Sequence, residues 1–177
     1  MSKLSSTFKP HVERWYEGLK RISEPNQAIG TVRADATLIA DQASEVNNGG
    51  HVLVSDEPSA VGGGDKGPNP LEYFMASVGF CENVTCARYA TLNGLDFDSL
   101  QTSVRGHWDR QGQGDFMKIE PAFTDFTVET RLTSTDPIEK IRKVVKTVHE
   151  RCPMHSTITK AGRVTDKLFV NGLEVPL

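Results

Sequence analysis

Three cysteines and two histidines are the side chains of this 177-residue sequence whose spacing is suited to chemistry. Cys81 and Cys86 fall in one apolar segment, and Cys152 lies seventy-one residues after Cys81 in the run HERCPMHS. A thiolate that attacks a substrate, with a second thiol that then forms a disulfide with it, makes a reversible redox site. Free cysteines are also among the most buried residues in proteins, and most of them are inert. Two interpretations therefore stay open at this point: one redox site made of two distant segments, or ordinary buried thiols.

The same run HERCPMHS places three metal-ligand types close together. His149, Cys152 and His155 form the pattern H-x-x-C-x-x-H, which is able to hold zinc with Cys81 as a fourth ligand. Pro153 interrupts the helical spacing that would bring these side chains together. We therefore expect no metal and no other cofactor. A more modest role for His155 is a hydrogen bond to Cys152, which would assist proton transfer during disulfide formation.

The segment that carries Cys81 has the signals of a helix start. Asn69 is a suitable N-cap, Pro70 occupies the first helical position and Glu72 the third, which is the arrangement of a capping box. We expect this helix to run to Leu92. Apolar residues fall on nearly every side of it, and such a helix is buried in the middle of its protein.

Cys152 is expected at the C-terminal end of a second helix, which opens at Asp136. The partial negative charge of a helix C-terminus disfavours a thiolate there, so Cys81 is the better nucleophile of the two. Cys86 is unable to form a disulfide with Cys81 inside one intact helix. Five residues at ~100° each turn the two side chains ~140° apart, whereas a disulfide needs Cα atoms within about 7 Å. Only Cys152 is left as a partner for Cys81.

The other expected elements are one more helix and a set of alternating strands. Apolar residues at helical spacing predict an amphipathic helix over residues 8–22, which ends at residues 24–26. Alternating polarity predicts strands at residues 31–40, 51–56, 99–108 and 126–132, and a final strand and turn at 164–172. The residues NNGG predict a hairpin turn before the second strand. The sequence thus predicts an α+β protein with an N-terminal helical extension, residues 1–26, and a domain over residues 27–177.

Composition narrows the classes of function. The sequence is 37% hydrophobic and 24% charged, with a net charge of −3. Nothing in it is basic enough to track a phosphate backbone, so we expect no nucleic-acid partner. No uninterrupted apolar run approaches the ~20 residues of a membrane span, and the N-terminus has no apolar core of a signal peptide. Three cysteines do not make a disulfide framework and suit a reducing compartment. We expect a cytoplasmic protein with no membrane partner.

Two motifs, taken together, resemble a known family. The run GPNPLEYFMASVGFC, which ends at Cys81, is followed about seventy residues later by HERCPMHS around Cys152. This order and spacing is similar to that of the OsmC/Ohr family of thiol-dependent hydroperoxide reductases and their relatives. The run SDEP at residues 55–58, with the glycine-rich loop after it, resembles the OsmC-like branch. The resemblance extends from roughly Thr31 to the C-terminus, so residues 27–177 would be the OsmC-like domain.

The resemblance implies a fold, an assembly and a reaction. The fold would consist of antiparallel sheets around two central helices, and two chains would intertwine as a homodimer with active sites at the interface. Cys81 would attack the peroxide and become a sulfenic acid, and Cys152 would then form a disulfide with it. A dithiol reductant would restore both thiols.

The resemblance also implies two further catalytic residues, which this chain carries at shifted positions. The reductases have a glutamate directly after the motif proline, where this chain has Leu71 and places its glutamate one position later, at Glu72. They also have an arginine in the loop after the first strand. The corresponding residues 40–50 contain none, and Arg33 on the preceding strand is the nearest substitute. The expected catalytic residues are therefore Cys81, Cys152, Glu72 and Arg33.

Two hypotheses of different class follow. In the first, the protein is a thiol-dependent peroxidase that reduces organic hydroperoxides through a cycle of Cys81 and Cys152, in defence against oxidative stress. In the second, it is a non-enzymatic OsmC-like protein that binds an apolar small molecule at the dimer interface. Both motif cysteines favour the first hypothesis, and the missing loop arginine favours the second.

Overall fold

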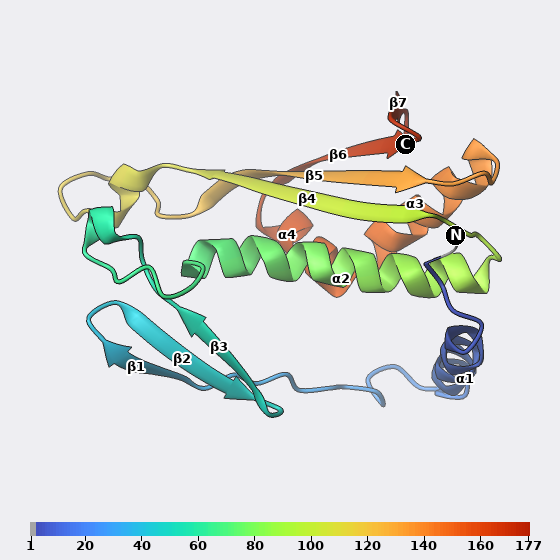
Figure 1. Ribbon diagram of the computed structural model, residues 1–177, viewed down its shortest axis with the longest axis horizontal. Coiled ribbons are helices and arrows are strands. Elements are labelled where there is room, and N and C mark those ends of the chain that lie inside the picture. The colour runs from blue at the N-terminus through green and yellow to red at the C-terminus, as the bar shows by residue number, and fades with distance from the viewer. Residues whose placement is uncertain (1–2) are drawn as a thin grey trace. The chain divides into compact units, whose positions relative to one another are not determined.

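The computed structural model describes residues 3–177, which form both helices and strands (Figure 1). The helices are α1 (Phe8–Lys20), α2 (Pro70–Leu92), α3 (Ile138–Arg151) and α4 (Pro153–Ala161). The strands are β1 (Ala36–Ala40), β2 (Ala43–Asn48), β3 (His51–Ser55), β4 (Ser99–Trp108), β5 (Phe123–Thr133), β6 (Arg163–Val170) and β7 (Leu173–Val175). The α+β class is confirmed.

The chain forms two compact units. The first contains the N-terminal segment up to Lys20 together with residues 77–177, and the second contains residues 21–76. Helix α1 therefore packs with the first unit, where its Val12 is buried and Arg88 of α2 stacks over the ring of Trp15. The division of the sequence at residue 26 stays a prediction.

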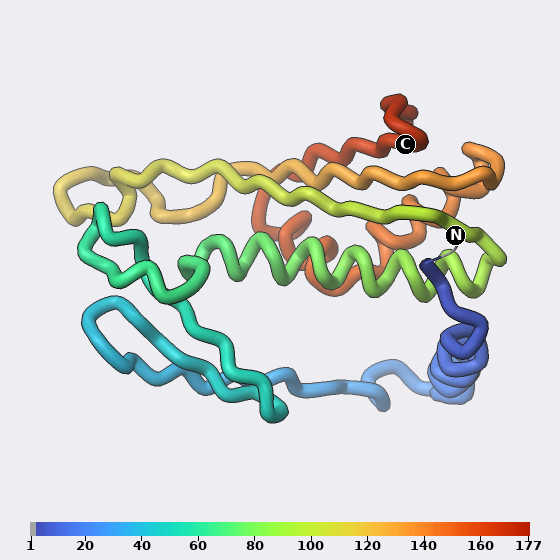
Figure 2. The backbone as a smooth tube through the Cα atoms, viewed as in Figure 1, coloured from blue at the N-terminus to red at the C-terminus, as the bar shows by residue number. Residues whose placement is uncertain are grey.

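The first unit is built on a four-stranded sheet in the order β4-β5-β6-β7. Strands β4 and β5 pair antiparallel, as do β6 and β7, but β5 and β6 pair parallel. A parallel pair needs a crossover connection, and α3 and α4 supply it; Figure 2 follows the chain along this path. The helices α2, α3 and α4 lie along one face of the sheet (Figure 1).

The core of this unit fills the space between that sheet and the helices. Helix α3 contributes a stripe at helical spacing, because the apolar side chains of Ile141, Val144, Val145 and Val148 all face inward. The same cluster includes Cys86, Ala90, Leu95, Phe97, Leu132, Leu168 and Val170. Helices α2 and α3 thus pack on the same face of one sheet.

The second unit contains a three-stranded antiparallel sheet in the order β1-β2-β3. The predicted hairpin is confirmed: Gly49 and Gly50 adopt positive φ angles of 58° and 81° between β2 and β3, which glycine does without steric cost. Two details of the prediction are wrong. The first strand begins at Ala36 rather than Thr31, and β2 occupies residues that were expected to be a loop.

Helix α2 begins as predicted but is not buried on every side. The amide N–H of Glu72 donates to the Asn69 side chain at 2.9 Å, and the amide of Asn69 donates to the Glu72 carboxylate at 2.9 Å. This reciprocal pair is a capping box. Further along the helix, however, Phe80 is 69% exposed and Val84 is 49% exposed. A single chain therefore leaves one apolar side of α2 in contact with solvent.

Pro153 marks the end of one helix and the start of another. Helix α3 stops at Arg151, but α4 starts directly at Pro153, with Cys152 as the residue between them. Proline is tolerated at the first helical position because the N–H it lacks has no partner there in any helix. The prediction that Cys152 lies at the C-terminal end of the second helix is therefore confirmed, but the sequence analysis did not predict α4. Among residues 3–177, no helix combines the length and hydrophobicity required to cross a lipid bilayer.

We predict that the core around Leu132 sets the stability of the first unit. Leu132 is 2% exposed and belongs to the cluster between β5 and α3, so Leu132→Ala should leave a cavity and lower the free energy of unfolding by about 2–5 kcal/mol. Urea denaturation followed by circular dichroism measures this loss. Leu173, which is 73% exposed, is the matched control, and Leu173→Ala should change stability by less than about 0.5 kcal/mol. Equal effects of the two substitutions would contradict the assignment of the core.

Candidate active site

The thiols of Cys81 and Cys152 meet within the first unit. Cys81 lies on α2 and Cys152 lies in the break between α3 and α4, and their side chains share a hydrogen bond. Both are free thiols, as is Cys86. The side chain of Cys81 is partly exposed, whereas Cys152 is fully buried at 0% exposure. The structure thus brings together two of the residues that the sequence predicts to be catalytic.

Cys152 occupies a position between two helix ends. Its backbone N–H donates to Val148 and caps α3, while its Sγ atom accepts a hydrogen bond from the backbone N–H of His155 at 3.5 Å and caps α4. Cys152 therefore lies at the negative C-terminal end of α3, as expected, and also at the positive N-terminal end of α4. Burial raises the pKa of the Cys152 thiol to about 12, although the His155 amide opposes this, and the hydrogen bond with Cys81 and the charge of Glu82 add to it.

Cys86 does not take part in this contact. It is 3% exposed and packs in the core cluster beside α3. Burial, with a smaller contribution from Glu82, raises the pKa of Cys86 to about 12. A thiol that is buried and protonated is inert.

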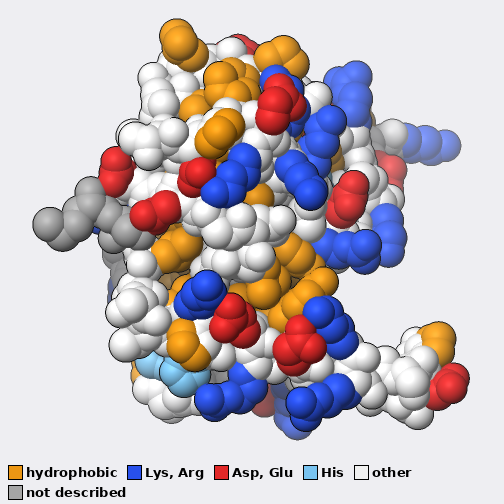
Figure 3. Space-filling model, turned by 90° about the vertical axis from the view of Figure 1, so that its right-hand side faces the viewer, with side chains coloured by type: hydrophobic (Ala, Val, Ile, Leu, Met, Phe, Trp, Pro, Cys, Tyr) orange, Lys and Arg blue, Asp and Glu red, His pale blue; other side chains and the backbone are white. Residues whose placement is uncertain are grey.

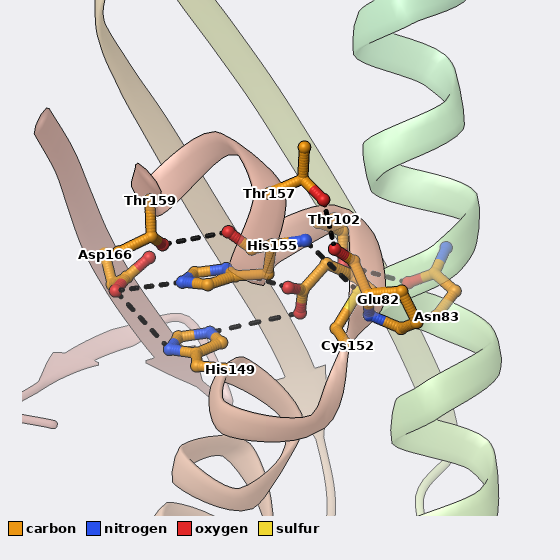
Figure 4. A network of polar contacts seen from close by, with 10 residues as sticks. Glu82, Asn83, Thr102, His149, Cys152, His155, Thr157, Thr159 and Asp166 are labelled. Atoms are coloured by element: carbon orange, nitrogen blue, oxygen red, sulfur yellow. Dashed lines mark hydrogen bonds and ion pairs between the residues drawn. The ribbon is translucent and has the colours of Figure 1, made fainter. Parts of the chain in front are cut away.

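Next to the thiols lies a cluster of four ionisable side chains, here called the His–carboxylate cluster: Glu82 on α2, His149 on α3, His155 on α4 and Asp166 on β6 (Figure 4). The two imidazole rings stack with centroids 4.4 Å apart and planes within 6° of parallel. Figure 4 shows the Glu82 carboxylate on one side of the stacked rings and Asp166 on the other.

Each carboxylate approaches both rings of the cluster. On one side, Glu82 places Oε1 2.9 Å from Nδ1 of His155 and Oε2 4.0 Å from Nε2 of His149. On the other, Oδ2 of Asp166 lies 3.5 Å from Nδ1 of His149 and 3.8 Å from Nε2 of His155. The Glu82 side chain is only 2% exposed. A buried carboxylate is costly unless it is paired, and the imidazoles are its partners.

The two histidines respond differently to this environment. Burial alone would lower the pKa of His155, but its polar contact with Glu82 and the charges of Asp166 and Glu82 outweigh burial and raise that pKa. For His149, burial dominates over the two carboxylates, and the neighbouring His155 acts in the same direction, so its pKa is lowered. His155 is thus the imidazole of the pair that retains a proton more readily.

Sequence reasoning predicted the contact between His155 and Cys152 but not its form. The backbone amide of His155 makes this hydrogen bond, and the imidazole of His155 lies beside Glu82 instead, with Nδ1 2.9 Å from Oε1. Glu82 itself was missed. Its signal in the sequence was an acidic residue in a helix that is apolar on nearly every side, since a carboxylate at such a place requires a buried partner from another element.

The remaining two predicted residues, Glu72 and Arg33, belong to the second unit, and each has a local partner there. The Glu72 carboxylate accepts the Asn69 amide in the capping box. The Arg33 guanidinium pairs with Asp35 at 2.8 Å and is 78% exposed. These contacts describe a helix cap and a surface ion pair, and the catalytic roles of both residues stay predictions.

Comparison with solved structures identifies the fold. An OsmC-like protein from Mycoplasma pneumoniae has a TM-score of 0.69 at 17% identity, with 80% of this chain and 97% of that chain covered. An organic hydroperoxide resistance protein from Elizabethkingia anophelis has a TM-score of 0.63 at 16% identity, covering 82% and 99%. One from Legionella pneumophila has a TM-score of 0.59 at 19% identity, covering 81% and 100%. No curated protein sequence matches this chain significantly.

The family model of OsmC-like proteins matches residues 63–166. This match covers more than half of the chain and contains α2, both motif cysteines and every member of the His–carboxylate cluster. The chain therefore belongs to the OsmC-like protein family.

Proposed function

We propose that this protein is a thiol-dependent peroxidase that reduces organic hydroperoxides through Cys81 and Cys152. The observation that carries the proposal is the hydrogen bond between these two thiols, which come from segments far apart in the sequence. A thiol pair in contact is able to pass from dithiol to disulfide with little movement of the backbone. The relatives named as organic hydroperoxide resistance proteins add support through a shared fold.

The difference in exposure between the two thiols supports a fixed order of reaction. Cys81 is partly exposed and is reached by a peroxide from solvent, whereas Cys152 is fully buried behind it. We therefore assign attack to Cys81 and resolution to Cys152. Cys86, buried in the core cluster, takes no part.

The cycle balances with one external reductant. The Cys81 thiolate attacks the distal oxygen of the hydroperoxide, the O–O bond breaks, and the alkoxide takes up a proton to leave as an alcohol. Cys81 is then a sulfenic acid. The Cys152 sulfur attacks it, a disulfide forms and water is released. A dithiol reductant exchanges with this disulfide, becomes a disulfide itself and returns both thiols to the protein.

Apolar side chains beside Cys81 support an organic substrate. Phe80 precedes Cys81 in α2, and Val84 lies one turn further; they are 69% and 49% exposed. An alkyl or aryl hydroperoxide would gain from contact with these side chains, and hydrogen peroxide would not. The same surface also suits the alternative function, in which the protein binds an apolar molecule without reacting with it. Only a peroxidase consumes peroxide repeatedly, so a measurement of peroxide turnover distinguishes the two functions.

The first prediction of this proposal concerns turnover and thiol order. With cumene hydroperoxide and a dithiol reductant, the parent protein should consume peroxide, and Cys81→Ser should not, because it lacks the accessible thiol. In the absence of the reductant, Cys152→Ser should consume one equivalent of peroxide and hold a sulfenic acid on Cys81, which dimedone labels and intact mass spectrometry detects. The control variant Cys86→Ser should turn over like the parent. No peroxide consumption by the parent over hours, or dimedone labelling of Cys152 before Cys81, would refute the proposal.

A second prediction separates two roles of Glu72. Because its carboxylate completes the capping box with Asn69, we infer a structural role. Glutamine makes the same cap, so Glu72→Gln should retain both stability and the peroxide rate. Glu72→Ala removes the cap and should lower the unfolding free energy by about 0.3–1.5 kcal/mol. Stopped-flow peroxide kinetics and thermal unfolding of both variants provide the measurements. A rate lost in Glu72→Gln without loss of stability would show that the carboxylate is catalytic.

We also propose that the protein is a homodimer. Phe80 and Val84 leave an apolar side of α2 exposed in one chain, and exposed apolar patches commonly mark protein interfaces. Hydrophobic side chains also reach the surface among Lys, Arg, Asp and Glu on the face seen in Figure 3. A second copy that packs on this side of α2 would bury at least the roughly 1,600 Å² of a standard interface, and the apolar surface proposed for the substrate would then lie at the interface between the two chains.

The dimer yields a third prediction. Light scattering at micromolar concentration should give twice the mass of one chain. Phe80→Glu places a charge in the proposed interface and should shift the mass toward the monomer, because an unpaired charge is costly to bury. Leu173→Glu is the matched control, since Leu173 is equally exposed, at 73% against 69%, and lies on β7 away from α2. A monomeric parent protein, or equal dissociation by both variants, would contradict the proposal.

A further inference from the structure

The His–carboxylate cluster contains polar atoms that lack an aligned hydrogen bond. Within the described residues, five buried side-chain nitrogen or oxygen atoms have none, and four of them belong to this cluster: Glu82 Oε1, His149 Nε2, His155 Nδ1 and Asp166 Oδ1. Even the short contact of 2.9 Å between Glu82 and His155 is not directed along an N–H bond. Buried polar atoms are nearly always satisfied, and a group of exceptions in one place indicates a bound water or ion.

The charge of the cluster favours a cation over a water molecule. Two carboxylates lie against two imidazoles, and the Glu82 and His155 side chains are 2% and 6% exposed. The buried Glu82 carboxylate requires compensating positive charge, and the second carboxylate, Asp166, is 26% exposed. One proton on the pair of imidazoles would compensate only one of the two carboxylates, whereas a divalent cation balances both.

The donor atoms suit a transition metal. Two imidazole nitrogens and one carboxylate are the ligand set of many zinc sites, and the ligating atoms of Glu82, His149 and His155 all lie within 4.8 Å of one another. Ligands at about 2.0–2.2 Å from a zinc ion lie roughly 3–3.5 Å apart. Oε1 of Glu82 and Nδ1 of His155, at 2.9 Å, lie slightly closer together than this spacing. His149, whose Nε2 is 4.0 Å from Glu82, has to approach, by rotation about the soft ring torsion.

Asp166 is placed to orient the two histidines through their second ring nitrogens. Its Oδ2 atom lies 3.5 Å from His149 Nδ1 and 3.8 Å from His155 Nε2, which are the nitrogens on the side away from Glu82. Ligating histidines commonly donate their second N–H to a carboxylate, which orients the ring. The two carboxylates are therefore not equivalent: Glu82 is placed to ligate, and Asp166 is placed to orient.

We propose that Glu82, His149 and His155 bind one divalent transition-metal ion of the zinc type, with Asp166 as the orienting carboxylate. This site departs from our expectation of no metal, and from the set of His149, Cys152, His155 and Cys81 that the sequence pattern suggested. It uses no thiol and does not depend on the proposed peroxidase activity. Because its ligands come from α2, α3 and α4, the ion would stabilise the packing of these helices.

Zinc binding to the full-length protein tests the site. Protein freed of metal by a chelator is titrated with Zn²⁺ in competition with a chromophoric chelator, and its melting temperature is measured with and without Zn²⁺. We expect one ion per chain and a higher melting temperature. Glu82→Gln and His149→Ala should abolish binding, and Asp166→Asn should weaken it by about 10–100-fold. The control His107→Ala removes an exposed imidazole on β4 that pairs with Asp125 on β5, and this variant should bind zinc like the parent.

The thiols provide the second control. In the double variant Cys81→Ser/Cys152→Ser, which lacks both reactive sulfurs, zinc binding should persist, and bound Co²⁺ should show no thiolate-to-metal charge-transfer band. Failure of the peroxidase proposal would leave this result unchanged. Absence of stoichiometric zinc binding by the parent would overturn the site, as would binding that depends on the cysteines or is indifferent to both Glu82→Gln and Asp166→Asn. Circular dichroism tests whether each variant is folded. If Glu82→Gln does not fold, the zinc affinity of Asp166→Asn decides whether the site exists.

Discussion

A carboxylate buried on α2 is the constraint on which the arrangement of the first unit depends. Glu82 on α2 is 2% exposed, so it has to meet positive or hydrogen-bonding groups from elsewhere in the chain. Those groups are His149 and His155. They hold the end of α3 and the start of α4 against α2, and the residue between these two helix ends is Cys152. The thiol contact with Cys81 is therefore positioned by a neighbouring polar contact rather than by the sulfur atoms alone.

Helix geometry explains how one segment serves both contacts. Cys81 and Glu82 are consecutive, so their side chains leave α2 about 100° apart, one toward Cys152 and the other toward the imidazoles. Across from them, Cys152 caps α4 with its sulfur, and His155 lies within the first turn of the same helix. The break at Pro153 is what makes this possible, because a continuous helix would leave the amide of His155 bonded to a carbonyl one turn earlier and unable to donate to the Cys152 sulfur.

Much of this arrangement was predictable from the sequence, and the exceptions have physical causes. The capping box at Asn69 and the apolar stripe of α3 depend on local spacing, so they were predicted correctly. Helix α4 was missed because proline marks both the end of one helix and the start of the next. The parallel pairing of β5 and β6 follows from that crossover and has no local signal. Glu82 was missed because the partners of a buried carboxylate lie more than sixty residues away in the sequence.

The resemblance to the reductases predicted which cysteines would meet, but not the charges around them. Burial is the main cause of the raised pKa of Cys152, and the charged side chain that adds to it is an acid, Glu82, rather than an arginine. A negative charge raises the pKa of a thiol, and a positive charge lowers it. Arg33, the nearest substitute by sequence, is engaged by Asp35 within the second unit. The Glu82 carboxylate and the Cys81 thiol make different demands on α2, because a buried carboxylate needs a partner and a reactive thiol needs access from solvent. The protein separates these demands by direction around α2: the carboxylate is compensated on the side of the histidines, and the sulfur of Cys81 is left partly open to solvent.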